Sequence, residues 1–585
     1  MKQGRSPAGR YTRRRFLGLA GGAVAAAALV ACGRPGGQQP PPTPPPLDDP
    51  EPRAPGGRAP QPGPTRAARP VSRGTLRMTG LVTDDGVYDP HRTEAPAFYG
   101  WQSLVYSRLL TYRSQVEAII DADLATDLPE QPDQLTYVFT LRPGITWPED
   151  GPSRGRAVTA DDVKFSIDRQ KDGGVSFVRR PQWSAVDRVE VMGPGQLRVT
   201  MTEPRASMLA VFAAPNSYIV PTEIGDGSGF SATSQPGSGP FAWGTWERGT
   251  AARALRRPPR AGGPPAPYLD AIEITQPRDP AEIEARLRVK QLDAALLPRP
   301  IAEPLAERLP GIRTLTEGSS VFFGMRFFTP QVPYNDPRLR SAFAAAVDRQ
   351  EMIDQFFAGS GDVNPWVSWP LRQWTLPHAE VTGLPGYRAG STGREADIAE
   401  ARALMAAVRA STTLPEQFPL FVIEDAEATL GMGALIRRQL RETLDVDVSV
   451  YPLPVSELVS RMLIGEAPWA AGPDIGPVDL DDWLYPFFHS QSPRNSFALR
   501  DSELDALIDA QRREFEPAQR RELGWAAQRR LLALNAGVNF VSERLIVLAW
   551  PYVRDLPLDA ADGYQHRLAA TWLDGTDPSY RGRAT

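Results

Sequence analysis

The stretch FPLFVI (residues 418–423), EATLGMGALIRRQLRETL (427–444) and VDVSVYPL (446–453) decides the fold class. Its first and last segments are short apolar runs, and the last alternates valine with other residues, which is the pattern of a β-strand. The middle segment has the length of a helix. A strand, a helix and a strand in this order predict a parallel β-α-β unit with a right-handed crossover. We therefore expect a mixed α/β protein.

Two stretches nearer the N-terminus support this fold class. TYVFTLRPGITW (136–147) alternates and ends at a Pro-Gly pair, which predicts a strand followed by a turn. VTADDVKFSIDR (158–169) predicts the start of a helix with Thr159 as N-cap. Asp161 and Asp162 are expected to interact with the helix dipole and the cap rather than to perform acid/base chemistry.

The stretch NDPRLRSAFAAAVDRQEMIDQFFAGSG (335–361) predicts one continuous helix. Asp336 is its expected cap, and Pro337 suits the first helical position. Gly359 lies where a C-terminal stop is expected.

The N-terminal segment has the layout of an export signal rather than of a membrane span. From Phe16 to Ala31 it has 16 consecutive apolar or small residues, short of the roughly 20 that a spanning helix needs. Basic residues without any acid precede this run, as in a cleavable signal. TRRRFL (12–17) resembles a twin-arginine address, and LVAC (29–32) resembles a bacterial lipobox. We predict a signal peptide over residues 1–31 and lipidation of Cys32; an uncleaved anchor is the alternative.

Residues 32–74 are predicted to be a lipid-anchored, proline-rich linker. They contain 14 prolines and almost no large apolar side chains, so they have nothing to bury in a core. A proline motif that binds a partner is the alternative. The chain after residue 31 keeps 59 basic and 69 acidic residues, a formal net charge of −10. This argues against nucleic acid as a partner, because nucleic-acid binding needs a basic surface.

Sequence motifs for catalysis or metal binding are weak. One cysteine allows no internal disulfide and no cysteine zinc site. The four histidines are isolated and form no HExxH pattern, so we expect no dedicated metal site and no cofactor. GPSRG (151–155) matches the G-x-S-x-G pattern of hydrolases, but that motif needs a strand before the serine and a helix directly after it. A loop is predicted here, and a surface serine hydrolase that uses Ser153 is kept only as an alternative from another class.

Seven short blocks follow one another across the chain. They are YDPH (88–91), VYSRLLTY (105–112), TYVFTLRPGITW (136–147), VTADDVKFSIDR (158–169), GSGPFAWGTWERG (237–249), NDPRLRSAFAAAVDRQEMI (335–353) and DLDDWLYPFF (479–488). In this order, and over about residues 75–572, they resemble the family 5 extracellular solute-binding proteins, the ligand-capturing lipoproteins of peptide and nickel ABC importers. The resemblance implies an α/β, two-lobe periplasmic-binding-protein (type 2) fold with an extra subdomain in the first lobe.

The same resemblance implies a division of the chain. The first lobe is expected at residues 75–272, with 101–185 mostly the extra subdomain. The second lobe is expected at 273–547, and residues 548–585 return to the first lobe and form the C-terminal tail. Lobes of this kind close over a ligand in the cleft by hinge motion.

In the first lobe, the resemblance implies a ligand-contacting loop after the YDPH block. The matching residues are Glu94, Ala95 and Pro96, followed by Phe98 and Tyr99. In the family this loop lays its backbone along the ligand. Because Pro96 has no amide hydrogen, strand-like pairing at this position would rest on carbonyl groups.

In the second lobe, peptide-binding members place an acid before the segment that matches DLDDWL, where it pairs with the α-amino group of a peptide. In an alignment without a gap, this position corresponds to Gly476. Asp474 lies two residues earlier and could serve in its place if the loop shifts. The family's tryptophan-to-acid spacing is not preserved between Trp469 and Asp479. The resemblance implies ligand contacts from Trp469, Asp474 and Gly476, and it leaves the anchoring of an amine open.

Three more residues are candidates for the cleft. Arg326 either meets a ligand carboxylate or pairs with a surface acid. Trp366 and Trp369 lie in NPWVSWP (364–370), a loop expected to face the cleft. Aromatic rings there would stack on sugars or pack around peptide side chains, and burial in the core is the alternative.

The expected function is that of a lipid-anchored, ligand-capturing protein of an ABC importer at the extracytoplasmic face of the cell membrane. It would bind an oligopeptide or similar small solute as a monomer and deliver it to permease subunits, without catalysing a reaction. The alternative is a receptor of the same fold that senses or scavenges a ligand, such as an oligosaccharide or a metal chelate.

Overall fold

The computed structural model describes most of the chain after the predicted linker. The described residues are 70, 73–93, 96–114, 118–174, 176–227, 229–258, 267–277, 279–364, 366–367, 373–424, 427–475, 479–557 and 565–583. The predicted signal peptide, Cys32 and nearly all of the linker lie outside them. Within these residues, no helix combines the length and the hydropathy that crossing a bilayer would require.

The described chain contains both helices and strands throughout. The strands are β1 (Thr75–Thr79), β2 (Leu110–Ser114), β3 (Ile119–Ala122), β4 (Glu130–Asp133), β5 (Thr136–Thr140), β6 (Val186–Gly193), β7 (Gln196–Met201), β8 (Phe241–Glu247), β9 (Ala251–Arg256), β10 (Ala271–Thr275), β11 (Ala294–Pro298), β12 (Arg313–Phe327), β13 (Gly361–Val363), β14 (Phe418–Ile423), β15 (Val448–Leu453), β16 (Trp469–Ile475), β17 (Gly537–Ala549), β18 (Val553–Arg554) and β19 (Trp572–Leu573). The helices are α1 (Pro96–Gln102), α2 (Ala160–Lys171), α3 (Arg180–Trp183), α4 (Met208–Ala213), α5 (Pro280–Arg288), α6 (Arg299–Arg308), α7 (Pro337–Ala346), α8 (Arg349–Phe357), α9 (His378–Val381), α10 (Gly390–Ser411), α11 (Glu427–Leu444), α12 (Val455–Leu463), α13 (Asp481–Phe488), α14 (Ser502–Arg513) and α15 (Pro517–Leu534).

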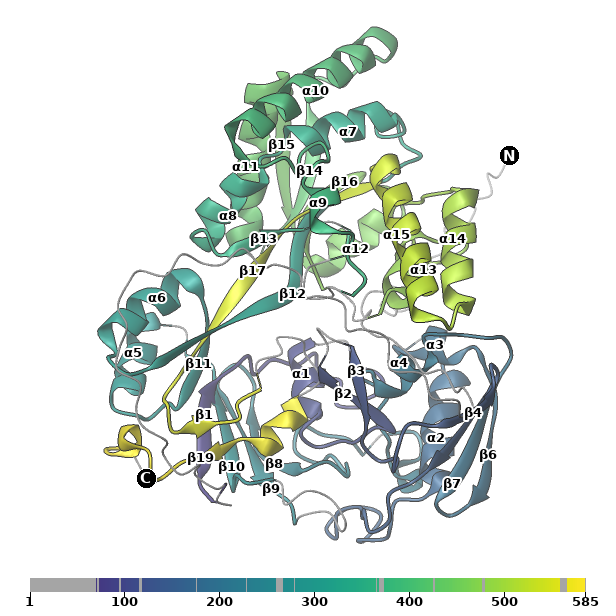
Figure 1. Cartoon of the computed structure of the whole chain (residues 1–585), viewed down its shortest axis with the longest axis vertical. Helices are drawn as coiled ribbons and strands as arrows, with labels where there is room; N and C mark the ends of the chain where they lie inside the picture. The colour runs from purple at the N-terminus through teal and green to yellow at the C-terminus, as the bar shows by residue number, and fades with distance from the viewer. Residues whose placement is uncertain are drawn as a thin grey trace, which may run out of the picture.

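One sheet connects two lobes, which stand one above the other in Figure 1. Its strand order is β15-β14-β16-β12-β17-β11-β1-β10-β9-β8, and β13 pairs with β17. In the upper, second lobe, β14 is parallel to β15 and β16. In the lower, first lobe, β1 is parallel to β10 and β11. The unit β14-α11-β15 confirms the predicted β-α-β pattern.

The long antiparallel strands β12 and β17 run from one lobe into the other. Their register shifts between the pairs Gly318–Arg544 and Phe322–Ser542. On the first-lobe side of this shift β17 pairs with β11, and on the second-lobe side β12 pairs with β16. A register shift of this kind disrupts the ladder and bends the strands locally. The chain therefore crosses between the lobes at this irregularity.

The crossing lies later in the chain than the predicted boundary at residues 272 and 273. That boundary falls inside β10, whose pairing with β1 and β9 continues to Thr275. The antiparallel sheet β4-β5-β7-β6 of the extra subdomain likewise continues to Met201, past the predicted end at residue 185. Strand pairing, which joins residues far apart in the sequence, sets both limits.

The predicted helix starts are confirmed, but the predicted continuous helix over 335–361 is wrong. α2 begins after Thr159, and the carboxylate of Asp336 caps α7 by accepting a bond from the amide of Arg338 at 2.9 Å. α7 ends at Ala346, and Asp348 starts α8 by accepting from the amide of Glu351 at 3.0 Å. An aspartate whose side chain satisfies a free helical amide favours a new helix start over continuation.

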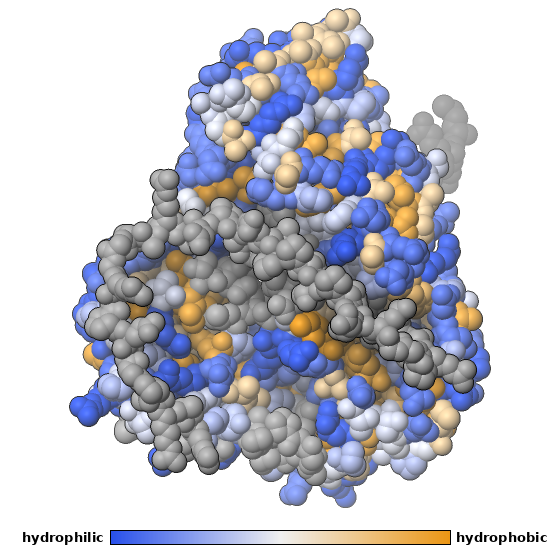
Figure 2. Space-filling model, in the orientation of Figure 1, coloured by the Kyte–Doolittle hydropathy of each residue, from blue (hydrophilic) through white to orange (hydrophobic). Residues whose placement is uncertain are grey.

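Three large apolar clusters form the core. One fills the first lobe around β1 and β10, and another fills the second lobe around β14 and α7. The third joins the extra subdomain to the second lobe, because Trp183 and Phe212 belong to the same buried cluster as Trp483 and Leu484 of α13. On the face drawn in Figure 2, the described residues show mixed hydrophilic and hydrophobic patches.

Candidate functional site

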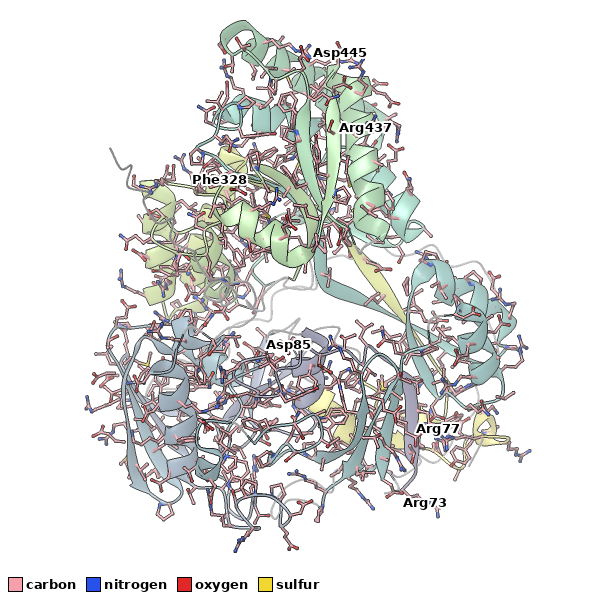
Figure 3. All side chains as sticks on the ribbon, turned by 180° about the vertical axis from the view of Figure 1, so that it is seen from behind. Arg73, Arg77, Asp85, Phe328, Arg437 and Asp445 are labelled. Atoms are coloured by element: carbon pink, nitrogen blue, oxygen red, sulfur yellow. The ribbon has the colours of Figure 1, made fainter. Side chains whose placement is uncertain are left out.

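The loop after β1 lies where the first lobe faces the second. Figure 3 shows Asp85 on the side of the first lobe nearest to the second lobe. The hydroxyl of Thr93 donates to the carboxylate of Asp85 at 3.0 Å, and the indole N–H of Trp101 donates to the carbonyl of Leu81 at 2.9 Å. The first bond joins two residues within the loop, and the second ties the start of the loop to α1.

A buried ion pair fixes the end of this loop to α2. Arg169 of α2 contacts the carboxylate of Asp89 at 2.5 and 3.0 Å, and its guanidinium also lies 3.0 Å from Nδ1 of His91. His91 Nε2 lies 2.6 Å from the carbonyl oxygen of Tyr218. Complete burial lowers the pKa of His91 to about 4, with Arg169 adding to the fall and Asp89 opposing it. The YDPH block and the VTADDVKFSIDR block are therefore one packed unit.

The segment predicted to lie extended along a ligand begins a helix. Pro96 is the first residue of α1, where proline is favoured because its missing amide hydrogen has no helical partner. Phe98 is completely buried and packs edge-on against the rings of Tyr88 and Trp246. The structure thus places Phe98 in the core, and its predicted contact with a ligand stays a prediction. The side chains of Pro96 and Tyr99, and all of Glu94 and Ala95, lie outside the described residues.

Trp469 of β16 is also a core residue. Its side chain is fully buried, and its ring stacks on Phe327 with the centroids 6.1 Å apart. The structure thus places Trp469 in the core, and its predicted contact with a ligand stays a prediction. Asp474 lies later on β16, where its backbone is opposite Phe322 of β12. The side chain of Asp474 and all of Gly476 are outside the described part of the chain, so their roles stay predictions.

Arg326 and Trp366 both lie next to the ring of Phe497. The guanidinium of Arg326 is 5.7 Å from that ring, and burial lowers the pKa of Arg326 to about 10. Arg326 is half-buried, in contrast to the exposed surface pairing considered from the sequence. Trp366 is 3% exposed and packs edge-on against Phe488 and Phe497, so the core alternative is correct for it. Trp369 lies outside the described residues.

The acidic block that begins at Asp479 is tied to the helices of the second lobe. The carboxylate of Asp479 accepts two bonds from the guanidinium of Arg520 on α15, at 2.6 and 2.8 Å. Both side chains are buried, and the guanidinium lies over the ring of Trp374 at 4.7 Å. Gln511 of α14 also accepts from Arg520 at 3.2 Å. This network fixes the start of α13.

The next two acids of the block contact the other lobe. Asp482 accepts from Gln182 at 3.2 Å and from Arg179 at 3.4 Å, both at α3 of the extra subdomain. Asp481 accepts from the hydroxyl of Ser207 at 3.1 Å, next to α4. Asp481 and Asp482 are 7% and 6% exposed. Neighbouring acids of the second lobe therefore make buried polar contacts with the first.

These two carboxyl groups have opposite electrostatic surroundings. Burial raises the pKa of Asp482 to about 6, with Asp479 and Asp481 adding to the rise and Arg179 opposing it. Burial also disfavours the charged form of Asp481, but the cations of Arg512, Arg205 and Arg520 outweigh it and hold the pKa of Asp481 below its ordinary value. The surroundings of Asp481 thus favour its carboxylate form, whereas those of Asp482 disfavour it.

Residues 120–495 match the family model for bacterial extracellular solute-binding proteins, family 5, middle region. The chain belongs to family 5 of the bacterial extracellular solute-binding proteins. Proteins of this family and fold are substrate-binding proteins. Members of the family are extracytoplasmic or periplasmic.

Curated relatives of this solute-binding protein carry peptide-binding names. Di/tripeptide-binding protein 2 of Pseudomonas aeruginosa is 27% identical over 302 residues, which cover 48% of this chain and 56% of that protein. The chain thus spans little more than half the length of that relative. Probable di/tripeptide-binding protein 5 of the same species is 23% identical over 475 residues, covering 76% of this chain and 86% of that protein.

Solved structures share the fold of this solute-binding protein at low identity. The periplasmic binding protein DppA of Helicobacter pylori, in complex with the peptide STSA, has a TM-score of 0.70 at 20% identity, covering 86% of this chain and 99% of that one. AgaA of A. tumefacien R10, in complex with agropinic acid, has a TM-score of 0.68 at 21% identity with the same coverage. NikZ of Campylobacter jejuni, in complex with Ni(L-His), has a TM-score of 0.67 at 16% identity, covering 85% of this chain and 99% of that one. These likenesses confirm the two-lobe type 2 fold.

The G-x-S-x-G segment of this solute-binding protein is a loop, as predicted. The hydroxyl of Ser153 donates to the carboxylate of Glu223 at 2.9 Å, and α2 begins only at Ala160. Hydrogen bonds from Arg156 are the main cause that lowers the pKa of Glu223 to about 2. A carboxylate with so low a pKa is a weak base at neutral pH. Within the described ranges, no group of three or more metal-ligating side chains comes together.

A surface hollow at the far end of the second lobe is separate from the interlobe contacts. It is bordered by Arg409, Phe418 and Asp445, among other residues. Figure 3 shows Asp445 at the end of the second lobe that is remote from the first. The guanidinium of Arg409 donates to the carbonyls of Leu444 and Asp445, each at 2.9 Å. This arginine therefore helps to end α11.

The sequence did not single out the interlobe contacts of Asp481 and Asp482. Their partners come from the extra subdomain, and Gln182 and Asp482 lie 300 residues apart. The available signal was the run of three acids within four positions, from Asp479 to Asp482, at the start of an apolar helix. Acids at a helix start are expected on electrostatic grounds alone, so the pattern did not distinguish a dipole partner from an interlobe contact.

Proposed function

We propose that this protein is the solute-capturing lipoprotein of an ABC importer. In this proposal it binds an oligopeptide or a similar small solute between its lobes, closes over the solute, and delivers it to permease subunits in the cell membrane. It acts as a monomer at the extracytoplasmic face, where a lipid on Cys32 holds it. A receptor of the same fold without its own transporter is the alternative.

Membership of the family 5 solute-binding proteins is the observation that carries this proposal. The structure supports it through the two strands β12 and β17, which run between the lobes and about which the lobes can rotate. The loop after β1 faces the second lobe (Figure 3), which agrees with ligand binding at the carboxyl ends of parallel strands.

Peptides are the first ligand class to test, because two curated relatives of Pseudomonas aeruginosa carry di/tripeptide-binding names. Solved proteins of the same fold also hold agropinic acid and Ni(L-His). Native mass spectrometry of the purified protein would test the proposal directly, because a tightly held solute survives purification. A bound peptide mass is the expected result. A bound sugar or chelate would change the ligand class, and no solute bound from a defined peptide mixture in calorimetry would reject peptide capture.

The lipid anchor needs a separate test. Cys32→Ser should move the protein from the membrane fraction to the soluble extracytoplasmic fraction while leaving ligand affinity unchanged, because Cys32 precedes the whole folded body. Several acyl chains hold a protein firmly at a membrane, whereas a chain without lipid has no such attachment. If the variant stays membrane-bound, the short apolar segment itself is the anchor and lipidation is rejected.

A further inference from the structure

The contact between α13 and the extra subdomain lies at the edge of the molecule opposite the β12–β17 crossing (Figure 1). We propose that Asp481 and Asp482 form a proton-dependent latch that holds the two lobes together at this edge. The latch comprises these two acids together with Arg179, Gln182 and Ser207 of the first lobe. The proposal goes beyond solute capture, because it concerns the equilibrium between open and closed lobes even without a ligand.

The latch connects α13 of the second lobe to two elements of the first lobe, α3 and α4. The N-terminus of α13 meets α3 through Asp482, and it meets the start of α4 through Asp481. Beside these contacts, the amide of Ala206 in the first lobe donates to the carbonyl of Arg512 on α14 at 2.8 Å. Every one of these bonds joins the first lobe to the second, so all of them break when the lobes separate at this edge.

The polar composition of this interlobe contact is typical of an interface that opens. Interfaces between moving domains are more polar than permanent ones, and here two buried carboxylates and the guanidinium of Arg179 lie within the contact. Opening returns these groups to water, which offsets part of the free energy lost with the apolar packing around Trp483. The register shift between β12 and β17 supplies a bend on the opposite side.

Protonation of Asp482 favours the closed arrangement. In the closed arrangement its pKa is about 6 because of burial, whereas a carboxyl exposed by opening has an ordinary pKa of about 3.9. The closed form therefore binds the proton more tightly, and by linkage a fall in pH from 7 to 5 raises the closing equilibrium constant about tenfold. The opposite shift of Asp481 weakens closure only as the pH falls below about 3.9, the ordinary pKa of an exposed aspartate, so of these two acids only Asp482 changes charge between pH 7 and pH 5.

Charged and polar groups from every neighbouring element face these two acids or their partners. They are Arg179 directly before α3, Gln182 of α3, Glu203, Arg205 and Ser207 before α4, Asp479 before α13, Gln511 and Arg512 of α14, and Arg520 of α15. His489 at the end of α13 faces Asp505 and Asp509 of α14 instead. Histidine is a side-chain type that can change its charge near neutral pH, so the experiment includes a control variant at His489.

The test measures the distance between the lobes without ligand. Spin labels at Asp133→Cys on β4 and Glu416→Cys before β14, both exposed sites, report lobe separation by pulsed electron resonance in a Cys32→Ser chain. The ratio of short to long distances should rise about tenfold from pH 7 to pH 5. With Asp482→Asn, an uncharged side chain of the same shape, the ratio should be the same at both pH values and match the acidic value of the parent.

Three controls keep the outcome specific to the latch. Asp447→Asn removes an exposed acid of the second lobe, and His489→Asn removes the histidine; both should keep the parent response. Arg179→Gln removes the cation that opposes the rise in the pKa of Asp482, so the transition should move to higher pH. A ratio that is equal at pH 7 and pH 5 in the parent, or a response that persists in Asp482→Asn, would overturn the latch without touching solute capture. Circular dichroism identifies any variant that fails to fold.

Discussion

Replacement of Asp89 by asparagine tests how the loop after β1 is held. Asp89 and Arg169 are each 6% exposed at their side chains, and the pair has contacts of 2.5 and 3.0 Å. Breaking a buried ion pair costs about 3–5 kcal/mol because one charge stays buried without its partner. Arg169 keeps a bond of 3.1 Å to the carbonyl of Asp226 and its position 5.1 Å from the ring of Phe177. We therefore expect a loss near the lower end, about 3 kcal/mol.

The assay is equilibrium unfolding in urea at pH 7.5, followed by circular dichroism and tryptophan fluorescence. Asp168→Asn is the matched control, because its pair with Lys164 lies on the same helix but has side chains that are 42% (Lys164) and 29% (Asp168) exposed, and helical pairs of this spacing contribute about 0.3–0.5 kcal/mol. Adding Arg169→Gln to Asp89→Asn should recover part of the loss, since no buried charge remains unpaired. A loss below about 1 kcal/mol for Asp89→Asn would refute the reasoning, and so would an equal loss for the control.

Three further predictions concern pH, ligand binding and close packing. The folded chain holds the pKa of His91 at about 4, whereas an unfolded histidine titrates near 6.5. The free energy of unfolding should therefore fall by about 3 kcal/mol as the pH is lowered from 6.5 to 4. In urea unfolding measured over this pH range, His91→Gln should flatten the dependence of the free energy of unfolding on pH. Asp474→Ala should weaken peptide binding at least tenfold, about 1.4 kcal/mol, and unchanged affinity in calorimetry would remove Asp474 as the anchor. A Cβ at Gly237 would lie 2.2 Å from the carbonyl oxygen of Val105, so Gly237→Ala should lower the free energy of unfolding by about 1–3 kcal/mol. An unchanged melting temperature would contradict the inference that the backbone at Gly237 must pack this closely against Val105.

Local features were predictable from the sequence because their causes are local. The β-α-β unit follows from hydrophobic periodicity, and the starts of α2 and α7 follow from Thr159 and Asp336, whose cap positions precede the helices directly. The break between α7 and α8 was missed, although Asp348 and Glu351 lie in a capping pattern. An apolar face that continues on both sides of a break hides it from periodicity alone.

The site was less predictable because its contacts are remote in the sequence. Trp469 and Phe98 are aromatic residues near family blocks, and nothing in their spacing tells a core ring from a ring that faces a ligand. The folded chain buries Trp469 against Phe327 and Phe98 against Trp246. Asp482 gains its role from Arg179, more than 300 residues earlier, and such a pair is visible only once the chain is folded.

The position of β17 in the sheet has a consequence for biosynthesis. β17 pairs with β11 on the first-lobe side and with β12 along its whole length, yet it comes near the end of the chain. A ribosome-bound chain therefore lacks the strand that completes both lobes until residues 537–549 have emerged, and Arg583, whose guanidinium pairs with the buried carboxylate of Asp293 at 2.7 Å, emerges later still. Neither lobe can therefore complete its part of the sheet before residues 537–549 are available.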